Sequence, residues 1–260
     1  MNKISAYIIS YNEERNIAEA VKSVLWADEV VVVDSFSSDR TAEIATALGA
    51  RVVQAPFEGF GKLRTTAIAS TSCEWVFSLD TDERCTDAAR DEIRRIVASP
   101  AAADAYFVPR RNVFMGRRIK HCGWYPDYRQ PQLFRRDAMT FDEAMVHEGY
   151  TVNGRTAIMQ SFIWQFPYRD LSQLISKMER YSTLGAQKLT DRERNATMFT
   201  AFLHGIVAFV RIYVFKLGFL DGWPGFVISF ANFEGTFYRY AKKVQTDSKW
   251  DNAGVAKRGD

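Results

Sequence analysis

The chain has 260 residues, 47% hydrophobic, 25% charged and 14% aromatic, with a formal net charge of +3. This balance is typical of a globular protein long enough to bury a substantial core. No dense Lys/Arg stripe is present, so we expect no nucleic-acid partner. Cys73, Cys85 and Cys122 are odd in number and lack metal-ligand spacing. They indicate reduced thiols in a cytosolic setting, and no signal peptide is expected before the first strand.

The first hundred residues alternate predicted strands and helices. In the first predicted helix, Ile17, Ala20, Val21 and Val24 recur at helical spacing on one face. Strands joined by helices predict right-handed crossovers and a mostly parallel sheet. The predicted strands cover 4–10, 30–33, 51–54 and 75–79, and later helices end at 49 and span 61–70.

Three of these strands end in acids or polar turns. Glu13 follows the first strand, Asp34 ends the second, and Asp80 with Asp82 follows the fourth. In an open α/β sheet, ligands bind beyond the carboxyl ends of the strands. The sequence therefore favours a ligand site at this edge of the sheet.

The fourth strand ends in three carboxylates within four residues, Asp80, Asp82 and Glu83. Because like charges at this spacing repel one another, a divalent cation would stabilise the turn. An Asp-x-Asp pair can hold Mg²⁺ or Mn²⁺ while substrate phosphates supply further ligands. The alternative is a solvated acidic turn before the helix that starts near Thr86.

Several stretches resemble a known family. Ile8 to Glu14, Val32 to Thr41 and Leu79 to Glu83 resemble, in order and spacing, the signatures of family-two glycosyltransferases with the GT-A fold. Downstream motifs resemble the branch containing lipopolysaccharide-core β-1,4-glucosyltransferases of the WaaE type; they lie at 110–116, 123–127, 133–135 and 146–148. The resemblance covers roughly residues 3–245. It implies inverting transfer of a hexose, with UDP-glucose the expected donor, to a lipid-linked saccharide.

The resemblance also implies roles for residues at the sheet edge. The nucleoside would be bound by Tyr11, Glu13 and Asp34. The alternative for Asp34 is a helix cap, which the sequence does not distinguish from a nucleoside contact. Asp80 would lie by the ribose and metal, with Asp82 the main ligand of an Mg²⁺ or Mn²⁺ ion.

Basic residues would approach the diphosphate. Lys62 and Arg64 match phosphate-facing positions, or they belong to a solvated helix face, and Thr65 stands where relatives carry Asn. Glu83 would either support the metal ligands or start the next helix. Relatives often carry a metal-binding His where this chain has Gln165.

The middle of the chain should bind the acceptor. The arginine-rich stretch 110–118 is a predicted hairpin or loop, facing either a phosphorylated sugar or solvent. By the resemblance, Glu148 is the base that deprotonates the acceptor hydroxyl, and His147 orients it or replaces it. The alternative makes His147 a core residue and Glu148 a surface acid. On a helix over 170–189, Lys177 and Arg180 face a diphosphate or lipid phosphate, or simply an amphipathic surface.

The predicted domains follow from this pattern. Residues 1–165 form the catalytic domain, with a nucleotide-sugar half (1–100) and an acceptor half (101–165). Residues 166–245 form a membrane-associating helical region, and 246–260 a disordered tail. The longest charge-free run, 195–210, is shorter than the roughly 20 residues that cross a bilayer. We therefore expect helices lying on anionic lipids at the cytoplasmic face of the inner membrane, peripheral or monotopic. The alternatives are a helical hairpin packed on the catalytic domain or on a second subunit, and a hairpin that spans the membrane. The oligomeric state stays open.

Two other functions compete. A phosphohydrolase with an Asp-x-Asp nucleophile pair usually carries Thr where this chain has Arg84. A membrane-associated nucleotide-binding scaffold would not need the four acids Asp34, Asp80, Asp82 and Glu148, all of which are present.

Overall fold

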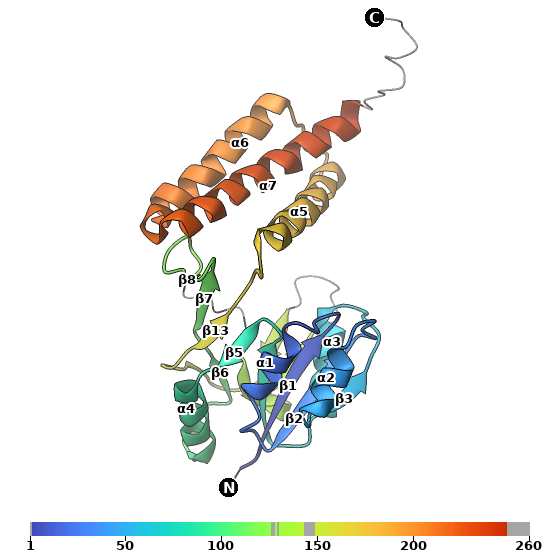
Figure 1. Cartoon of the computed structure of the whole chain (residues 1–260), viewed down its shortest axis with the longest axis vertical. Coiled ribbons are helices and arrows are strands. Elements are labelled where there is room, and N and C mark those ends of the chain that lie inside the picture. The colour runs from blue at the N-terminus through green and yellow to red at the C-terminus, as the bar shows by residue number, and fades with distance from the viewer. Residues whose placement is uncertain (1, 126–127, 129, 143–148, 249–260) are drawn as a thin grey trace, which may run out of the picture. The chain divides into compact units, whose positions relative to one another are not determined.

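The computed structural model describes residues 2–125, 128, 130–142 and 149–248. These residues divide into two compact units (Figure 1). The first holds Met1–Asn112 and Pro126–Phe166, and the second holds Val113–Tyr125 and Pro167–Asp260. The stretch 113–125, which the sequence placed in the catalytic domain, thus belongs with the C-terminal helices.

A seven-stranded sheet forms the first unit, in the order β12-β6-β9-β4-β1-β2-β3. All neighbouring strands are parallel except β9, which is antiparallel to β4 and β6. This confirms the predicted mostly parallel sheet. The strands are β1 (Ile4–Ser10), β2 (Glu29–Asp34), β3 (Arg51–Gln54), β4 (Trp75–Asp80), β6 (Ala105–Phe107), β9 (Leu133–Arg135) and β12 (Thr156–Ile158).

Helices flank this sheet at the predicted places. Thr86 caps α4, since its side chain accepts a hydrogen bond from Ala89 N. The helix expected near residue 39 begins at Thr41 and has no side-chain cap. The helices are α1 (Ile17–Lys22), α2 (Thr41–Ala47), α3 (Phe60–Ser70), α4 (Asp87–Ala98) and the short 3-10 turn η1 (Arg136–Ala138).

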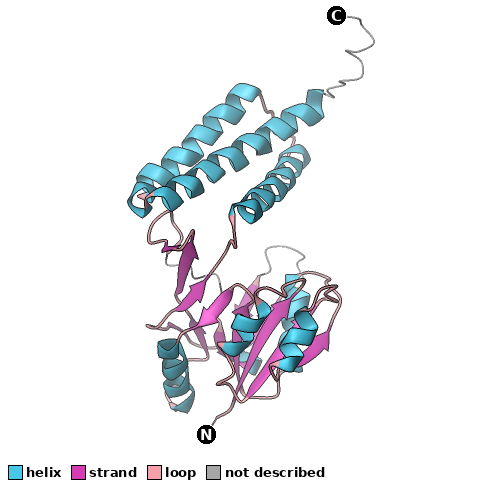
Figure 2. Cartoon of the chain, in the orientation of Figure 1, coloured by secondary structure: helices cyan, strands magenta, loops and turns pink. Residues whose placement is uncertain are grey.

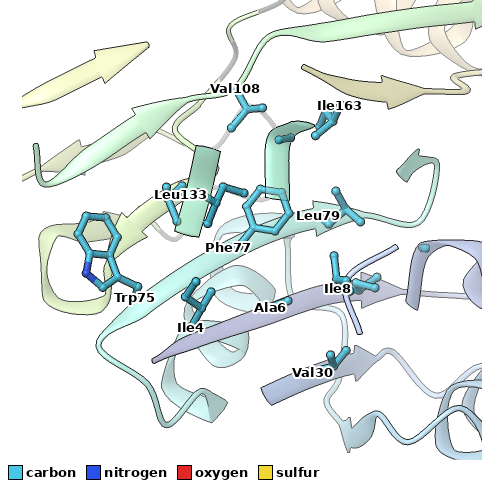
Figure 3. Packing of buried hydrophobic residues seen from close by; sticks show 14 of the residues in the cluster. Ile4, Ala6, Ile8, Val30, Trp75, Phe77, Leu79, Val108, Leu133 and Ile163 are labelled. Carbon is cyan, nitrogen blue, oxygen red and sulfur yellow. The ribbon is translucent and has the colours of Figure 1, made fainter. Parts of the chain in front are cut away.

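Alternate residues of β1 enter two hydrophobic clusters on opposite faces of the sheet. Ile4, Ala6 and Ile8 lie in one cluster, and Tyr7 and Ile9 lie in the other. Figure 3 shows the first cluster, where β4 and more distant segments complete the packing. Burying each large apolar side chain stabilises the fold by about 1.5–3 kcal/mol. Burial on both faces explains why β1 is apolar at every position except Ser5 and Ser10.

Shorter strands form two further sheets, in the orders β10-β11 and β5-β13-β7-β8 (Figure 2). The predicted hairpin at 110–118 is confirmed, because β7 pairs antiparallel with β8. The sequence did not predict β5, which has only three residues. The strands are β5 (Glu83–Cys85), β13 (Ile163–Gln165), β7 (Arg110–Phe114) and β8 (Arg117–Arg118), together with the antiparallel pair β10 (Met139–Phe141) and β11 (Tyr150–Val152).

Three long helices form most of the second unit, and α7 packs along both α5 and α6. A side chain at Gly205 of α6 would collide with Phe233 of α7, so glycine permits their close approach. The predicted helix over 170–189 is confirmed as α5, and α7 extends three residues into the stretch predicted as a tail. The elements are α5 (Leu171–Asp191), α6 (Met198–Val210), the π-helical η2 (Arg211–Phe215), the 3-10 turn η3 (Gly218–Asp221) and α7 (Trp223–Ser248).

Candidate functional site

The carboxyl ends of β4, β1 and β2 meet at one edge of the main sheet. The parallel register pairs Ile9 of β1 with Asp80 of β4, and Ser10 of β1 with Asp34 of β2. The acids that the sequence singled out at the ends of these strands therefore lie on neighbouring strands. This confirms the predicted collection of acids at one sheet edge.

The loops after β1 and β2 are joined by hydrogen bonds. Asn12 N donates to Ser37 Oγ at 2.8 Å, and Ser38 N donates to Asn12 Oδ1 at 2.8 Å. Glu13 N donates to Thr41 Oγ1 at 2.8 Å. The first two family-like stretches thus form one connected surface beyond the sheet.

The Asp34 carboxylate is fully buried and orders the loop after β2. Its Oδ1 accepts hydrogen bonds from the Ser10 hydroxyl at 2.9 Å and from the Ser37 hydroxyl, and its Oδ2 accepts from Ser37 N at 2.9 Å. Because α2 begins at Thr41, the alternative in which Asp34 caps this helix is wrong. An ionised carboxylate has about four acceptor positions, so these three donors leave about one for a ligand.

Two aromatic side chains stand exposed at the same edge. Tyr11, directly after β1, and Phe36, two residues after β2, are each 62% exposed. Exposed aromatic faces can stack on a nucleobase. The sequence analysis missed Phe36, whose φ of 56° lies in the left-handed region. Glu13 is half-buried and accepts a hydrogen bond from Asn16 Nδ2 at 2.7 Å.

The two basic residues of α3 have different surroundings. Arg64 is buried; its Nη2 lies 3.0 Å from Asp80 Oδ1 and its Nη1 donates to Ser78 Oγ at 3.3 Å. Burial alone would lower the pKa of Arg64, but the charge of Asp80 and the contact with Tyr7 raise the pKa overall, so the guanidinium stays cationic. A solvated helix face is therefore wrong for Arg64. Lys62 is half-buried and pairs with Glu58 at 3.0 Å.

A buried polar cluster supports the acidic turn. Glu83 is fully buried in β5, where it is ion-paired with Arg110 Nε of β7. The other carboxylate oxygen, Oε2, accepts from Gln132 Nε2 at 2.8 Å and from Asp80 N at 3.0 Å. Burial raises the pKa of Glu83, with Arg110 acting in the opposite direction. Glu83 thus holds the backbone of Asp80 in place.

This cluster corrects two expectations. Glu83 does not start a helix, because Thr86 caps α4 three residues later. Arg110 neither faces an acceptor nor lies in solvent, because the pairing of β7 with β13 turns it inward toward Glu83. Sequence reasoning missed Gln132, whose only local signal is a polar residue directly before the apolar strand β9.

The Asp82 carboxylate is half-buried beside β13. Its Oδ2 accepts from Gln165 Nε2 at 3.5 Å, and Phe166 N donates to the Asp82 carbonyl at 2.8 Å. Within the described part of the chain, no group of three or more His, Cys, Asp or Glu side chains could hold a metal. Mg²⁺ and Mn²⁺ are often held by one or two carboxylates plus phosphates and water. Asp80 and Asp82 therefore fit such an ion when a diphosphate completes its ligands.

Arg84 ties this turn to the first loop. Its guanidinium donates to the carbonyls of Thr81 at 2.7 Å, Glu83 at 2.6 Å and Asn16 at 3.2 Å. Burial lowers the pKa of Arg84. The residue that departs from the phosphohydrolase pattern therefore has a structural task, which is to connect the Asp-x-Asp turn to the loop after β1.

The predicted base and its neighbour, Glu148 and His147, lie outside the described residues. The ends of their segment are described. Asp142 N donates to the Gly149 carbonyl at 3.0 Å. The ring of Phe141, the last residue of β10, has its centroid 5.9 Å from the Arg64 guanidinium carbon. Phe141 thus lies beside Arg64, which pairs with Asp80.

The predicted phosphate contacts of the helical region lie on α5, in the second unit. Lys177 Nζ donates to the Pro167 carbonyl at 3.0 Å and lies 5.2 Å from the ring centroid of Tyr168. Arg180 is exposed. Their role toward a diphosphate or a lipid phosphate stays a prediction.

The sheet order and the acidic edge define the class as GT-A-like glycosyltransferases, with a mostly parallel sheet, flanking helices and an Asp-x-Asp turn after β4. The chain belongs to glycosyl transferase family 2, whose family model matches residues 5–162. This confirms the predicted enzyme class, a glycosyltransferase.

Curated relatives match over nearly the whole chain. An uncharacterized glycosyltransferase of Rickettsia typhi is 28% identical over 97% of this chain and 90% of its own length. The lipopolysaccharide core biosynthesis glycosyltransferase LpsC of Rhizobium meliloti is 26% identical over 93% of this chain and 94% of its own. Among solved structures, S. aureus TarS 1–349 in complex with UDP-GlcNAc is 16% identical, with a TM-score of 0.49 over 96% of this chain and 93% of that one.

Proposed function

We propose that this family 2 enzyme transfers glucose from UDP-glucose, with inversion, onto a lipid-linked saccharide such as the lipopolysaccharide inner core. The observation that carries the proposal is the Asp80–Asp82 turn, held by buried Glu83 at the carboxyl edge it shares with β1 and β2. The similarity to a lipopolysaccharide core glycosyltransferase supports the choice of acceptor. The resemblance of the downstream motifs to the WaaE type supports the choice of glucose.

In this proposal the nucleoside binds over the loops after β1 and β2. Tyr11 would stack on the base, and Glu13 would accept from the ribose. Asp34 would use its remaining acceptor position for uracil N3–H, while Ser10 and Ser37 hold its carboxylate. Phe36 is a second exposed aromatic at this edge.

The diphosphate would lie between α3 and the acidic turn. Asp82 and Asp80 would hold Mg²⁺ or Mn²⁺, which when bound offsets the charge on the leaving nucleotide. Arg64 keeps the Asp80 carboxylate oriented, and the half-buried Lys62 would reach the phosphates. Gln165 would orient Asp82 in place of a metal-binding His.

Inversion requires a base on the acceptor side. Glu148 would take the proton of the acceptor hydroxyl as its oxygen attacks the anomeric carbon and UDP leaves, with His147 orienting it. The position of Phe141 beside Arg64 supports this placement, because Phe141 precedes the segment that carries both residues.

We place the reaction at the cytoplasmic face of the inner membrane. One helical stretch of the described chain, Met198–Phe215, is long and apolar enough to cross a bilayer, with a mean hydropathy of 1.8 and 11% of it buried. We propose that it lies on the membrane rather than spanning it, because Arg211 interrupts it. Lys177 and Arg180 of α5 would then face a diphosphate or lipid phosphate.

A donor screen tests the proposal. Full-length protein is incubated with UDP-glucose, UDP-galactose or UDP-GlcNAc and a membrane extract as acceptor, and released UDP is measured. We expect release from UDP-glucose that requires both the extract and a divalent cation. Full activity in EDTA would contradict the metal site, and release without the extract would indicate hydrolysis instead of transfer.

A further inference from the structure

The turn between α6 and α7 exposes large apolar side chains that glycosyl transfer does not use. Phe215 is 77% exposed, Trp223 75% and Leu220 57%. We call residues 214–223 the apolar turn; its other exposed apolar residues are Val214, Leu217 and Phe219. Contiguous exposed apolar side chains mark interaction sites.

Residues 117–122, which we call the basic segment, are hydrogen-bonded to this turn although they lie far from it in sequence. The Asp221 carboxylate accepts from Lys120 N at 3.0 Å and from His121 N at 2.8 Å. Cys122 N donates to the Lys216 carbonyl at 2.9 Å. These hydrogen bonds join two segments that are about a hundred residues apart in sequence. Both segments belong to the second unit, where they form one continuous surface.

The charge of this surface is one-sided. Residues 113–125 and 198–233 contain five Lys or Arg residues and one acid, Asp221. Asp221 is buried by its contacts with the basic segment, whereas Arg117, Lys120 and Lys216 are exposed. The apolar turn is therefore bordered by cations, and its one carboxylate faces inward.

The exposed apolar surface continues along α6. Phe199, Leu203 and Val207 are exposed, and their spacing of four residues places them on one side of the helix. Buried Gly205 lies on the side that packs against α7. The exposed apolar face of α6 is in contact with water. This contact is unfavourable, so burying the face against an apolar partner would lower the free energy.

We propose that the apolar turn docks on a membrane surface that contains anionic lipids. Phe215, Leu220 and Trp223 would lie at the boundary between headgroups and acyl chains, as amphipathic elements do. Arg117, Lys120 and Lys216 would contact the anionic headgroups, each worth about fivefold in affinity. This deepens the membrane part of the proposed function and does not depend on which sugar is transferred.

Charge disfavours a second copy of the chain as the occupant. A two-fold symmetric dimer brings the same patch of both copies together. The bordering cations would then face one another, since the one acid of the patch is buried. An anionic bilayer satisfies both the apolar side chains and the cations.

Vesicle flotation of the full-length protein tests the apolar contact. The apolar variant carries Phe215→Ser, Leu220→Ser and Trp223→Ser, all at exposed positions, so the fold should be kept. We expect its binding to vesicles of phosphatidylcholine mixed with phosphatidylglycerol to fall about tenfold or more. The control variant, Leu25→Ser with Phe57→Ser and Ile158→Ser, removes exposed apolar groups of the first unit and should bind like wild type.

A charge variant tests the cations. Arg117→Gln, Lys120→Gln and Lys216→Gln together should weaken binding to the anionic vesicles about 100-fold, with little change on phosphatidylcholine alone. The control, Lys3→Gln with Arg94→Gln and Arg95→Gln, removes the same charge elsewhere and should have a much smaller effect. High salt should imitate the charge variant but not the apolar one.

Calorimetry with UDP-glucose separates this proposal from the proposed function, because donor binding should be equal in all four variants and wild type. Equal flotation of the apolar and control variants would overturn the proposal, as would wild-type binding that ignores phosphatidylglycerol. A dimer that the apolar variant disperses, in a protein that does not float, would assign the turn to a second copy instead.

Discussion

The two units differ in which energetically unfavourable side-chain placements they contain: buried charges in the first, and exposed large apolar groups in the second. The first unit draws charged groups inward and pairs them, as with Glu83 and Arg110. The second unit leaves large apolar groups outside, as with Phe199, Phe215 and Trp223. Burying a charge costs free energy unless it is paired, and exposing apolar surface costs free energy in water.

This difference in buried charge and exposed apolar surface indicates which kind of partner each unit binds. A buried ion pair is weak evidence for stability, but it fixes the geometry of the turn that carries Asp80 and Asp82. Trp223 packs only one side against Phe226 of its own unit and leaves most of its ring in water. This difference agrees with the proposals that the first unit binds a small polar ligand and the second an extended apolar surface.

The largest expected effect is at the acidic turn. Asp82→Ala should reduce transfer to background and abolish metal-dependent donor binding, because the cation loses its main protein ligand. UDP release and calorimetry measure the two effects. Asp87→Ala is the matched control, since Asp87 is an exposed acid only five residues away, and its activity should be near that of wild type. Metal-dependent binding retained by the Asp82 variant would move the site elsewhere.

The predicted base gives the next effect. Glu148→Gln keeps the shape of the side chain and removes its basicity, so turnover should fall by about 10²–10⁴. Donor binding should stay within a few-fold of wild type, because the base acts on the acceptor. Steady-state kinetics and calorimetry distinguish the two quantities. Unchanged turnover would exclude Glu148 and direct attention to His147.

The buried pair should affect stability more than a half-buried cation on the same strand does. Arg110→Met leaves Glu83 buried without its cation, which should lower the free energy of unfolding by about 3–5 kcal/mol. Arg111→Met, on the same strand, removes a cation whose guanidinium lies 3.5 Å from the Phe162 ring centroid, and should cost about 0.5–2 kcal/mol. Urea denaturation measures both. Equal losses would show that the ion pair has no special role.

The smallest effect concerns a partly exposed charge at the start of β2. Burial alone would raise the pKa of Glu29, but hydrogen bonds from Ser5, Arg51 and Ser72 lower the pKa from 4.5 to about 2. A lowered carboxyl pKa contributes stability that is fully present above about pH 4.5 and lost as the pH falls toward 2. The unfolding free energy of Glu29→Gln should therefore fall less than that of wild type across this window. Parallel curves would contradict the assignment.

The sequence by itself determined the strands and helices of the main sheet and the acids at its edge. A strand buried on both faces is largely apolar, as at β1 and β4, where Ser5 and Ser78 are the polar exceptions, and an acid or a polar turn marks its end. Caps such as Thr86 and Asp170 are equally local, because the side chain bonds a backbone N–H three residues on. These features depend on neighbours in sequence, so a linear pattern contains them.

Only the tertiary structure decided how the polar groups and the apolar surface are arranged. Glu83 meets Arg110 and Gln132 across short strands, and a three-residue strand such as β5 has no readable alternation. Asp221 meets Lys120 about a hundred residues away. An inward-facing and an outward-facing arginine look the same in sequence, because strand pairing sets the direction of each side chain. The exposure of Phe215 and Trp223 is likewise a property of packing, since the same residues in a buried helical hairpin would form a core.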